Sequence, residues 1–161
     1  TKFAEAIVRE DNFRGDQTFY IKPTFLSPIC EALQDSSELN FNLLADITCV
    51  DWLDHPVAEA GRFEVVYNLY SIPNQCRFFL KAMLPADKPE IASLTPLWNG
   101  ANWMEREVFD LFGITFVGHP ELTKILTPDD LDGHPLRRDF PLTYEEPQFT
   151  FNKDLPPEVI K

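Results

Sequence analysis

The chain has 161 residues, enough for one domain with a core that folds without disulfide or metal cross-links. Aromatic residues make up 13% of the sequence, which excludes an intrinsically disordered chain. The formal net charge of −12 argues against a general role in binding nucleic acid or an anionic lipid surface. No stretch approaches the ~20 consecutive apolar residues of a membrane-spanning helix.

The three cysteines, Cys30, Cys49 and Cys76, are far apart and form no C-x-x-C pair. A zinc site or an iron–sulfur cluster therefore cannot be built from the cysteine ligands of this chain alone. We expect all three to be buried free thiols, as in a protein of a reducing compartment.

The first forty residues predict two helices with a strand between them. Residues 3–9 predict a short helix, and residues 17–22, rich in aromatic and β-branched side chains, predict a strand. Ser27 and Pro28 are typical of the N-cap and first residue of a second helix, which should end near Asp35.

Three strands are predicted next. Residues 41–51 form an irregular pattern in which Asp46 interrupts the alternation, so we expect either a bulge or a change of buried face there. Residues 62–70 and 75–84 alternate apolar and polar side chains and predict a hairpin with its turn at residues 71–74. This order of elements predicts an α+β fold, in which helices pack on a small mixed, mainly antiparallel sheet. A β-helix-β opening would make one pair of strands parallel.

The rest of the chain is organised around a helix of about three turns between Asn102 and Gly113. Asn102 is expected to be the N-cap with Glu105 as its capping-box partner, and Gly113 to end the helix in a left-handed conformation. Two residues break the amphipathic pattern, because Trp103 falls on the charged face and Glu105 on the apolar face. Either Trp103 lies under Arg106 as a cation–π pair and Glu105 only serves the cap, or a second protein covers the outer face.

Seven of the fourteen prolines lie beyond residue 113, so regular secondary structure is not expected to persist there. We therefore divide the chain into an α+β domain, residues 1–113, and a long, proline-rich, irregular C-terminal extension, residues 114–161. The extension keeps many large apolar side chains, such as Phe149 and Phe151. This composition predicts an extended arm that wraps a partner subunit.

The extension also carries the candidates for chemistry. His119 and His134, each followed by proline, can supply metal ligands or an acid–base pair together with the acidic residues 129–132, as in a free-standing metal-dependent enzyme. The simpler interpretation is that each His-Pro pair makes a turn and its imidazole bonds to the backbone. Arg137 and Arg138 can bind carboxylates of another chain, with a weak surface ion pair as the simpler alternative.

Two runs resemble one known family: EREVFDLFGITFVGHPELTKIL, residues 105–126, and GHPLRRDFPL, residues 133–142. They are similar to the thirty-kilodalton subunit, also called the C subunit, of proton-pumping NADH:quinone oxidoreductase, which is respiratory complex I. Residues 46–51, 62–69 and 93–103 also look like that family, so the resemblance covers most of the chain. It weakens before residue 15 and after about residue 145.

The resemblance implies a non-catalytic scaffold and assembly subunit of the peripheral arm, docked near the quinone-reducing module on the forty-nine-kilodalton subunit, also called the D subunit. It implies no cofactor in this chain, with FMN and iron–sulfur clusters in partner subunits and the enzyme activity belonging to the whole complex. The implied location is the cytoplasmic face of a bacterial inner membrane, or the matrix side in mitochondria. The positions with implied structural and interface roles are Trp103, Glu105, Arg106, Glu107, Asp110, His119, Pro120, Lys124, Gly133, His134, Pro135, Arg137, Arg138, Asp139 and Pro141.

Two further functions remain as alternatives. The first is the equivalent subunit of an energy-converting membrane-bound hydrogenase, which shares ancestry with complex I. The second is a quinone-binding or proton-relay role for His119 and His134.

Overall fold

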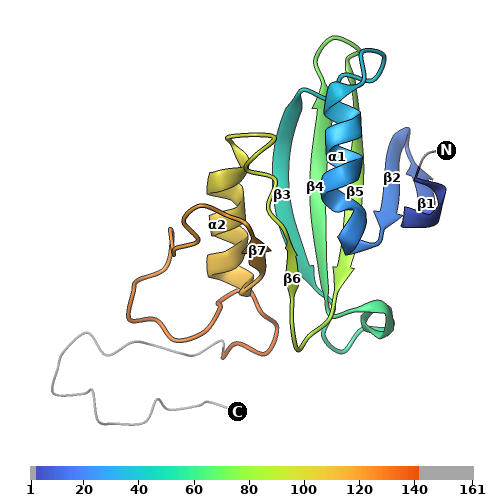
Figure 1. The fold of residues 1–161 in the computed structure, drawn as a ribbon. Coiled ribbons are helices and arrows are strands. Elements are labelled where there is room, and N and C mark those ends of the chain that lie inside the picture. Colours follow the sequence, from blue (N-terminus) through green and yellow to red (C-terminus); the bar gives the residue numbers. More distant parts are fainter. Residues whose placement is uncertain (1–2, 142–161) are drawn as a thin grey trace, which may run out of the picture.

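The structure, a computed structural model, describes residues 3–141. Its centre is a five-stranded sheet with the order β1-β2-β5-β4-β3 (Figure 1). β2 and β5 are parallel and the other neighbouring strands are antiparallel, which confirms the predicted α+β class with a mixed, mainly antiparallel sheet. The strands are β1 (Ile7–Phe13), β2 (Asp16–Ile21), β3 (Leu43–Asp51), β4 (Phe63–Ser71) and β5 (Cys76–Leu84).

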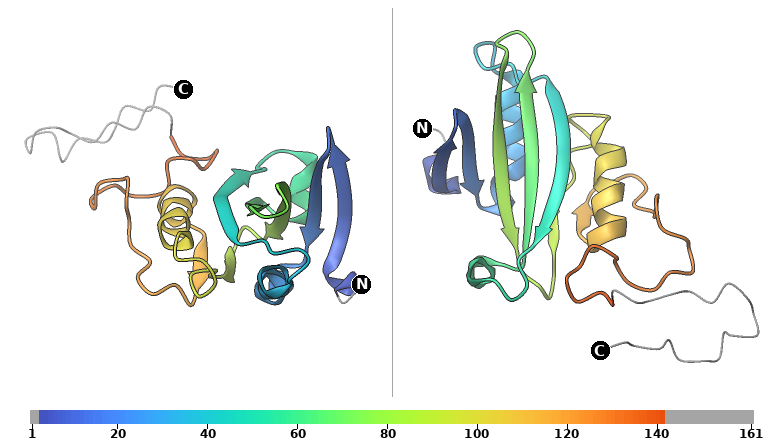
Figure 2. Two further views of the ribbon diagram at one scale, coloured as in Figure 1. Left: turned by 90° about the horizontal axis from the view of Figure 1, so that it is seen from above. Right: turned by 180° about the vertical axis from the view of Figure 1, so that it is seen from behind.

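Two α-helices pack on this sheet. α1 (Leu26–Asp35) lies over one face, and α2 (Ala101–Phe112) lies beside the β3 edge (Figure 1). From behind, no helix of residues 3–141 covers the opposite face (Figure 2). The smaller elements are the two parallel strands β6 (Glu90–Ala92) and β7 (Thr115–Val117), and the 3-10 turns η1 (Ala4–Ala6), η2 (Pro23–Phe25) and η3 (Pro56–Ala60). Within the described residues, no helix is long and apolar enough to cross a membrane.

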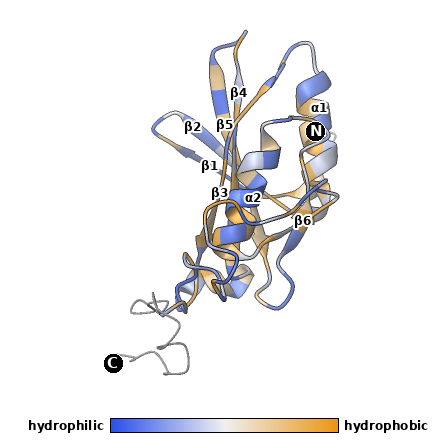
Figure 3. Cartoon of the chain, turned by 90° about the vertical axis from the view of Figure 1, so that its left-hand side faces the viewer, coloured by the Kyte–Doolittle hydropathy of each residue, from blue (hydrophilic) through white to orange (hydrophobic). Residues whose placement is uncertain are grey.

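The core lies between α1 and the central strands. Hydrophobic and hydrophilic residues alternate along β4 and β5 (Figure 3), because successive strand residues point to opposite faces of the sheet. The predicted hairpin is therefore confirmed in its strands and in its buried face. The apolar side chains that it buries are Phe63, Val65, Tyr67, Leu69, Phe78, Leu80, Ala82 and Leu84.

The N-terminal predictions need two corrections. The helix predicted over residues 3–9 is wrong, because only the short turn η1 forms and β1 then pairs with β2, with Ile7 opposite Ile21. The N-cap predicted at Ser27 is also wrong, because α1 continues directly from η2 and Ser27 lies in its first turn. There the Ser27 hydroxyl donates to Glu31 at 3.3 Å, and the helix ends at Asp35 as predicted.

Two predictions about the middle of the chain can be compared with the structure. The bulge expected at Asp46 is confirmed, since the β3–β4 register shifts between Leu44 and Asp46. Cys30 and Cys49 are buried thiols, and burial raises the pKa of each to about 12. The prediction for Cys76 is wrong, because this residue begins β5 next to the exposed hairpin turn.

The folded core does not stop at residue 113. β7 pairs with β6, and Ile114 and Phe116 are buried in the same core as the sheet. Residues 118–141, which we call the motif loop, then return over α2 and the end of the sheet (Figure 1). The predicted extension beyond Pro141 lies outside the described residues.

Candidate functional site

The ends of α2 determine where the motif loop meets the helix. The N-cap is Gly100, without a side-chain cap, so the capping box predicted for Asn102 and Glu105 is wrong. The C-terminal prediction is confirmed, because Gly113 has φ 72° and its N–H donates to the Phe109 carbonyl oxygen at 2.8 Å. Glycine is required there for a second reason, since a Cβ would collide with the side chains of His134 and Arg137.

Glu105 is fully buried and joins α2 to the segment that precedes it. One carboxylate oxygen accepts from the Ser93 hydroxyl at 2.7 Å, and the other accepts from the Leu94 backbone N–H at 2.6 Å. Burial raises its pKa to about 7, although these two hydrogen bonds act in the opposite direction. The residue that seemed misplaced on the apolar face therefore closes a buried polar contact.

Trp103 and Arg106 occupy the outer face of α2. The Arg106 guanidinium lies 5.3 Å from the centre of the Trp103 ring, as the cation–π interpretation predicts. Arg106 also donates from Nε to the Thr123 carbonyl oxygen at 3.1 Å and from Nη2 to the Lys124 carbonyl oxygen at 3.0 Å. Trp103 is 60% exposed, and its cover by a second protein remains a prediction.

Asp110 fixes the next part of the motif loop. Its Oδ2 atom accepts backbone N–H groups from Ile125, Leu126 and Thr127 at 2.7 to 3.0 Å, and its Oδ1 atom accepts from the Thr127 hydroxyl. Burial alone raises the pKa of Asp110, but these four hydrogen bonds outweigh it and lower the pKa to about 2. A single buried carboxylate thus determines the path of three consecutive residues.

Lys124 and His119 close the loop by bonds to its own backbone and to α2. The Lys124 ammonium donates to carbonyl oxygens of Pro128 and Leu131 at 3.1 and 2.7 Å. His119 accepts the Glu121 N–H at Nδ1 and donates from Nε2 to the Asn102 carbonyl oxygen. Both ring nitrogens of His119 are therefore used by the backbone, which confirms the simpler interpretation of this His-Pro turn.

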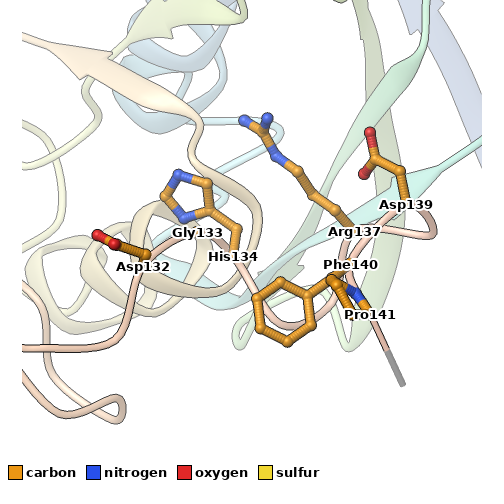
Figure 4. Close-up of a pocket in the computed structure, with 7 residues that line it drawn as sticks. All are labelled: Asp132, Gly133, His134, Arg137, Asp139, Phe140 and Pro141. Carbon is orange, nitrogen blue, oxygen red and sulfur yellow. The ribbon is translucent and has the colours of Figure 1, made fainter. Parts of the chain in front are cut away.

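The C-terminal end of α2 receives the second His-Pro turn. His134 donates from Nδ1 to the Asp110 carbonyl oxygen at 2.8 Å, and Arg137 donates from Nε to the Phe112 carbonyl oxygen at 2.6 Å. A cavity of about 390 Å³ lies beside these two side chains (Figure 4), with Phe140 among its lining residues. Both side chains thus pair with carbonyl oxygens of the last turn, which have no partner within the helix, and the positive charge of Arg137 is favourable at a helix C-terminus.

The last described residues are tied to the sheet by an ion-pair network. Arg62 binds the buried Asp51 carboxylate through two bonds, at 2.9 and 2.7 Å, and donates to Asp139 at 2.6 Å. Asp51 also accepts the backbone N–H of Arg138 at 3.0 Å, while the Arg138 guanidinium donates to the Leu53 carbonyl oxygen. In the described chain, Arg137 and Arg138 therefore bind backbone carbonyls of their own chain.

Burial alone raises the pKa of Asp51, but the bonds from Arg62, Arg138 and Leu53 lower it to about 2. We therefore predict unequal costs for removing the two carboxylates of this network. Asp51→Asn removes the buried carboxylate that accepts two bonds from Arg62 and leaves this cation with Asp139 alone, so it should lower the free energy of unfolding by about 3 kcal/mol. Asp139→Asn should lower it by less than about 1 kcal/mol, because the Asp139 side chain is 51% exposed. Urea denaturation of both variants measures the difference, and equal losses would contradict it.

The remaining motif residues have simpler places. Glu107 is exposed on α2, and Pro120, Gly133, Pro135 and Pro141 shape the turns of the motif loop. Of the residues that hold the loop, sequence reasoning did not single out Asp51, Arg62, Ser93 and Thr127. Only the Asp51–Arg62 pair had a local signal, because opposite charges stood at the facing ends of two predicted strands.

Among residues 3–141, no three His, Cys, Asp or Glu side chains converge as metal ligands. The charged groups of the motif loop act chiefly on the chain's own backbone and carboxylates. Their combined effect is to hold a loop of irregular backbone in one conformation on α2. The loop directs large apolar side chains outward, and those that are exposed are Ile125, Leu126 and Leu136.

Comparison with known proteins identifies this arrangement. Residues 19–146 match the family described as the 30 kDa subunit of the respiratory-chain NADH dehydrogenase. The chain belongs to this family. A curated relative is the C subunit of the NADH-quinone oxidoreductase of Roseiflexus sp. strain RS-1, which is 47% identical over 150 residues, covering 93% of this chain and 84% of that protein.

Two solved structures resemble this member of the NADH dehydrogenase subunit family. One is a trypsin-resistant fragment of Nqo5, with a TM-score of 0.65 and 35% identity over 71% of this chain and 89% of the fragment. The other is a chain of the membrane-bound sulfane sulfur reductase, an archaeal respiratory membrane complex. Its TM-score is 0.71 at 25% identity, covering 88% of this chain and 81% of that one.

Proposed function

We propose that this chain is a non-catalytic scaffold and assembly subunit in the peripheral arm of an NADH:quinone oxidoreductase. In this role it docks on the forty-nine-kilodalton subunit near the quinone-reducing module, at the cytoplasmic face of a bacterial membrane or the matrix side of a mitochondrial one. FMN and iron–sulfur clusters belong to partner subunits. Electron transfer is a property of the whole complex.

The observation that carries this proposal is the construction of the motif loop. Its charged residues form hydrogen bonds inside the chain, whereas Leu126, the most exposed of its large apolar residues, has 62% of its surface accessible. A loop that is fixed by buried polar contacts and points apolar side chains outward is typical of a preorganised protein interface. Trp103 extends this surface on α2, since large aromatic residues are enriched among the energetically dominant residues of interfaces.

The relationship to the sulfane sulfur reductase chain supports a second candidate, in which the same surface serves a related membrane-bound complex. The equivalent subunit of an energy-converting hydrogenase is one form of this candidate. The identity of the co-purifying chains separates the two. Flavin-bearing and NADH-binding subunits indicate the respiratory enzyme, and a nickel-bearing large subunit indicates the hydrogenase.

We predict that Leu126→Asp weakens assembly without unfolding the domain. The side chain is exposed, so its replacement leaves the core intact, but a carboxylate in an apolar interface loses its hydration. The amount of variant that co-purifies with the forty-nine-kilodalton subunit should fall by roughly tenfold or more. The matched control is Ile72→Asp, an equally apolar and 58% exposed position in the turn between β4 and β5. Unchanged co-purification of Leu126→Asp, or equal losses in both variants, would contradict the proposal.

A further inference from the structure

A second surface of the chain is an apolar groove at the opposite edge of the sheet from α2. It has a volume of about 900 Å³ and lies between α1 and the hairpin of β1 and β2. β2 and β5 provide its floor, α1 provides one wall, and the N-terminal segment closes one end. Apolar side chains that line it include Ile7, Phe19, Ile21, Ile29, Leu33 and Phe78.

The size of the helix layer explains why this groove is open. Five strands spaced ~4.8 Å apart make a sheet roughly 20 Å wide, whereas one packed helix covers about 10 Å. α1 lies over the middle of the sheet and α2 lies beside β3, so the hairpin at the other edge has no helix over it (Figure 1). All seven residues of β1 are exposed. The groove therefore lies where a further helix could pack on the sheet beside α1.

The shape of the groove favours a helix as the occupant. α1 has 10 residues, which gives the wall a length of about 15 Å and room for roughly three turns of a neighbouring helix. The floor is apolar, as the inward stripe of an amphipathic helix requires. The polar groups that line the hairpin end are the amides of Asn12 and Gln17.

The charges around the groove favour a basic occupant. The exposed acidic residues in or beside the segments that line it include Glu5, Glu10, Glu31 and Glu38, against the exposed cations Arg14 at the hairpin turn and Lys22 after Ile21. Arg77 lies on the rim as well, but its guanidinium is paired with Asp16 through two bonds of 3.1 Å. With a net charge of −12 for the whole chain, this edge complements a helix with a basic polar face.

We propose that the groove is a second docking surface, occupied by a basic amphipathic helix from another subunit of the same complex. This inference rests on the proposed function as a complex subunit. The motif loop and the groove lie at opposite edges of the sheet, so the chain can bind two partners at once (Figures 1 and 2). The chain would then link neighbouring subunits as well as cover one of them.

Cys76 provides a natural reporter for this surface. It lines the groove and is exposed, whereas Cys30 and Cys49 are buried. The experiment compares the rate of alkylation of Cys76 by N-ethylmaleimide in the isolated chain and in the purified complex. Occupation of the groove should slow this reaction by roughly tenfold or more. Equal rates in the two samples would overturn the inference.

A photo-crosslinking p-benzoylphenylalanine in place of Leu39, an exposed lining residue, identifies the occupant in the irradiated complex. We expect crosslinks to a helical segment of another subunit that carries Lys or Arg on its polar face. Crosslinks to a second copy of this chain, to an acidic or non-helical segment, or to lipid would overturn the inference.

Two matched variants test the charge requirement. Leu39→Lys places a cation at the groove, where it repels a basic helix, and should restore rapid alkylation of Cys76 in the complex. Val57→Lys places the same cation on η3, at a position that does not line the groove, and should leave Cys76 protected. If Cys76 of the Leu39→Lys variant is still protected from alkylation in the complex, the inference that the helix is basic is wrong. If the chain never enters the complex, the proposed function itself is wrong. If the chain enters the complex and Cys76 is still alkylated rapidly, only the proposal that a helix occupies the groove is wrong.

Discussion

Replacing Asp110 by Ala should release the motif loop from α2 and lower the free energy of unfolding by about 3 kcal/mol. The buried carboxylate accepts three backbone N–H groups and one hydroxyl, and all four bonds are strengthened by its charge. Alanine carries no acceptor oxygen, so none of these four donors keeps its bond to α2. The backbone groups of residues 125–127 then lose their partner.

Urea denaturation measures the stability loss, and limited proteolysis of the isolated chain reports on the loop. In the variant we expect cleavage within residues 118–141 at protease concentrations that leave the parent chain intact. Glu107→Ala is the matched control, because Glu107 lies on the same helix but is exposed. A variant at position 110 with parent-like stability and a protected loop would show that Asp110 does not hold it.

The stability of the chain should depend on pH through Glu105. Its ordinary pKa is 4.5, and burial raises it to about 7 in the folded chain. Between these values the folded state holds a proton that the unfolded state has lost. Stability from this residue is therefore full below pH 4.5 and declines as pH rises through 7, by an amount on the order of 3 kcal/mol.

The variant Glu105→Gln isolates this contribution. Its amide can still accept the Leu94 N–H and can donate to the Ser93 hydroxyl, so the buried contact is preserved without a titrating group. We expect Glu105→Gln to be more stable than the parent chain at pH 8 and about equal to it at pH 4. Thermal unfolding across this range gives the comparison. A difference that does not change with pH would exclude a titrating Glu105.

Local patterns predicted the strands of the hairpin, the end of α2 at Gly113 and the bulge at Asp46, because these features depend on neighbouring residues. The helix predicted over residues 3–9 failed for the opposite reason. β1 exists because β2 pairs with it, and its own sequence has no clear alternation. Tertiary pairing there outweighs local propensity.

The candidate site shows the same limit. The motif residues could be named from the sequence, but most of their partners could not. Asp110 binds backbone N–H groups, which leave no trace in side-chain identity, and Glu105 reaches Ser93, 12 residues earlier in the chain. Asp51 accepts the backbone N–H of Arg138, which lies 87 residues later in the chain, and no sequence periodicity links residues that far apart. The chemical type of each motif residue could therefore be read from the sequence, whereas its hydrogen-bond partners could be identified only from the fold.

That separation of 87 residues also bears on the order in which contacts form during folding. Closing so long a segment costs conformational entropy, which the late contacts must offset. The Asp51–Arg62 pair forms at the end of β3 and β4 where the segment with η3 connects them, and α2 must be helical before Asp110 and the Phe112 carbonyl oxygen can bind the loop. We therefore expect the outward apolar surface to be assembled last. In that order, Leu126 and Leu136 reach the positions in which a partner can bind them only after the sheet and α2 are complete.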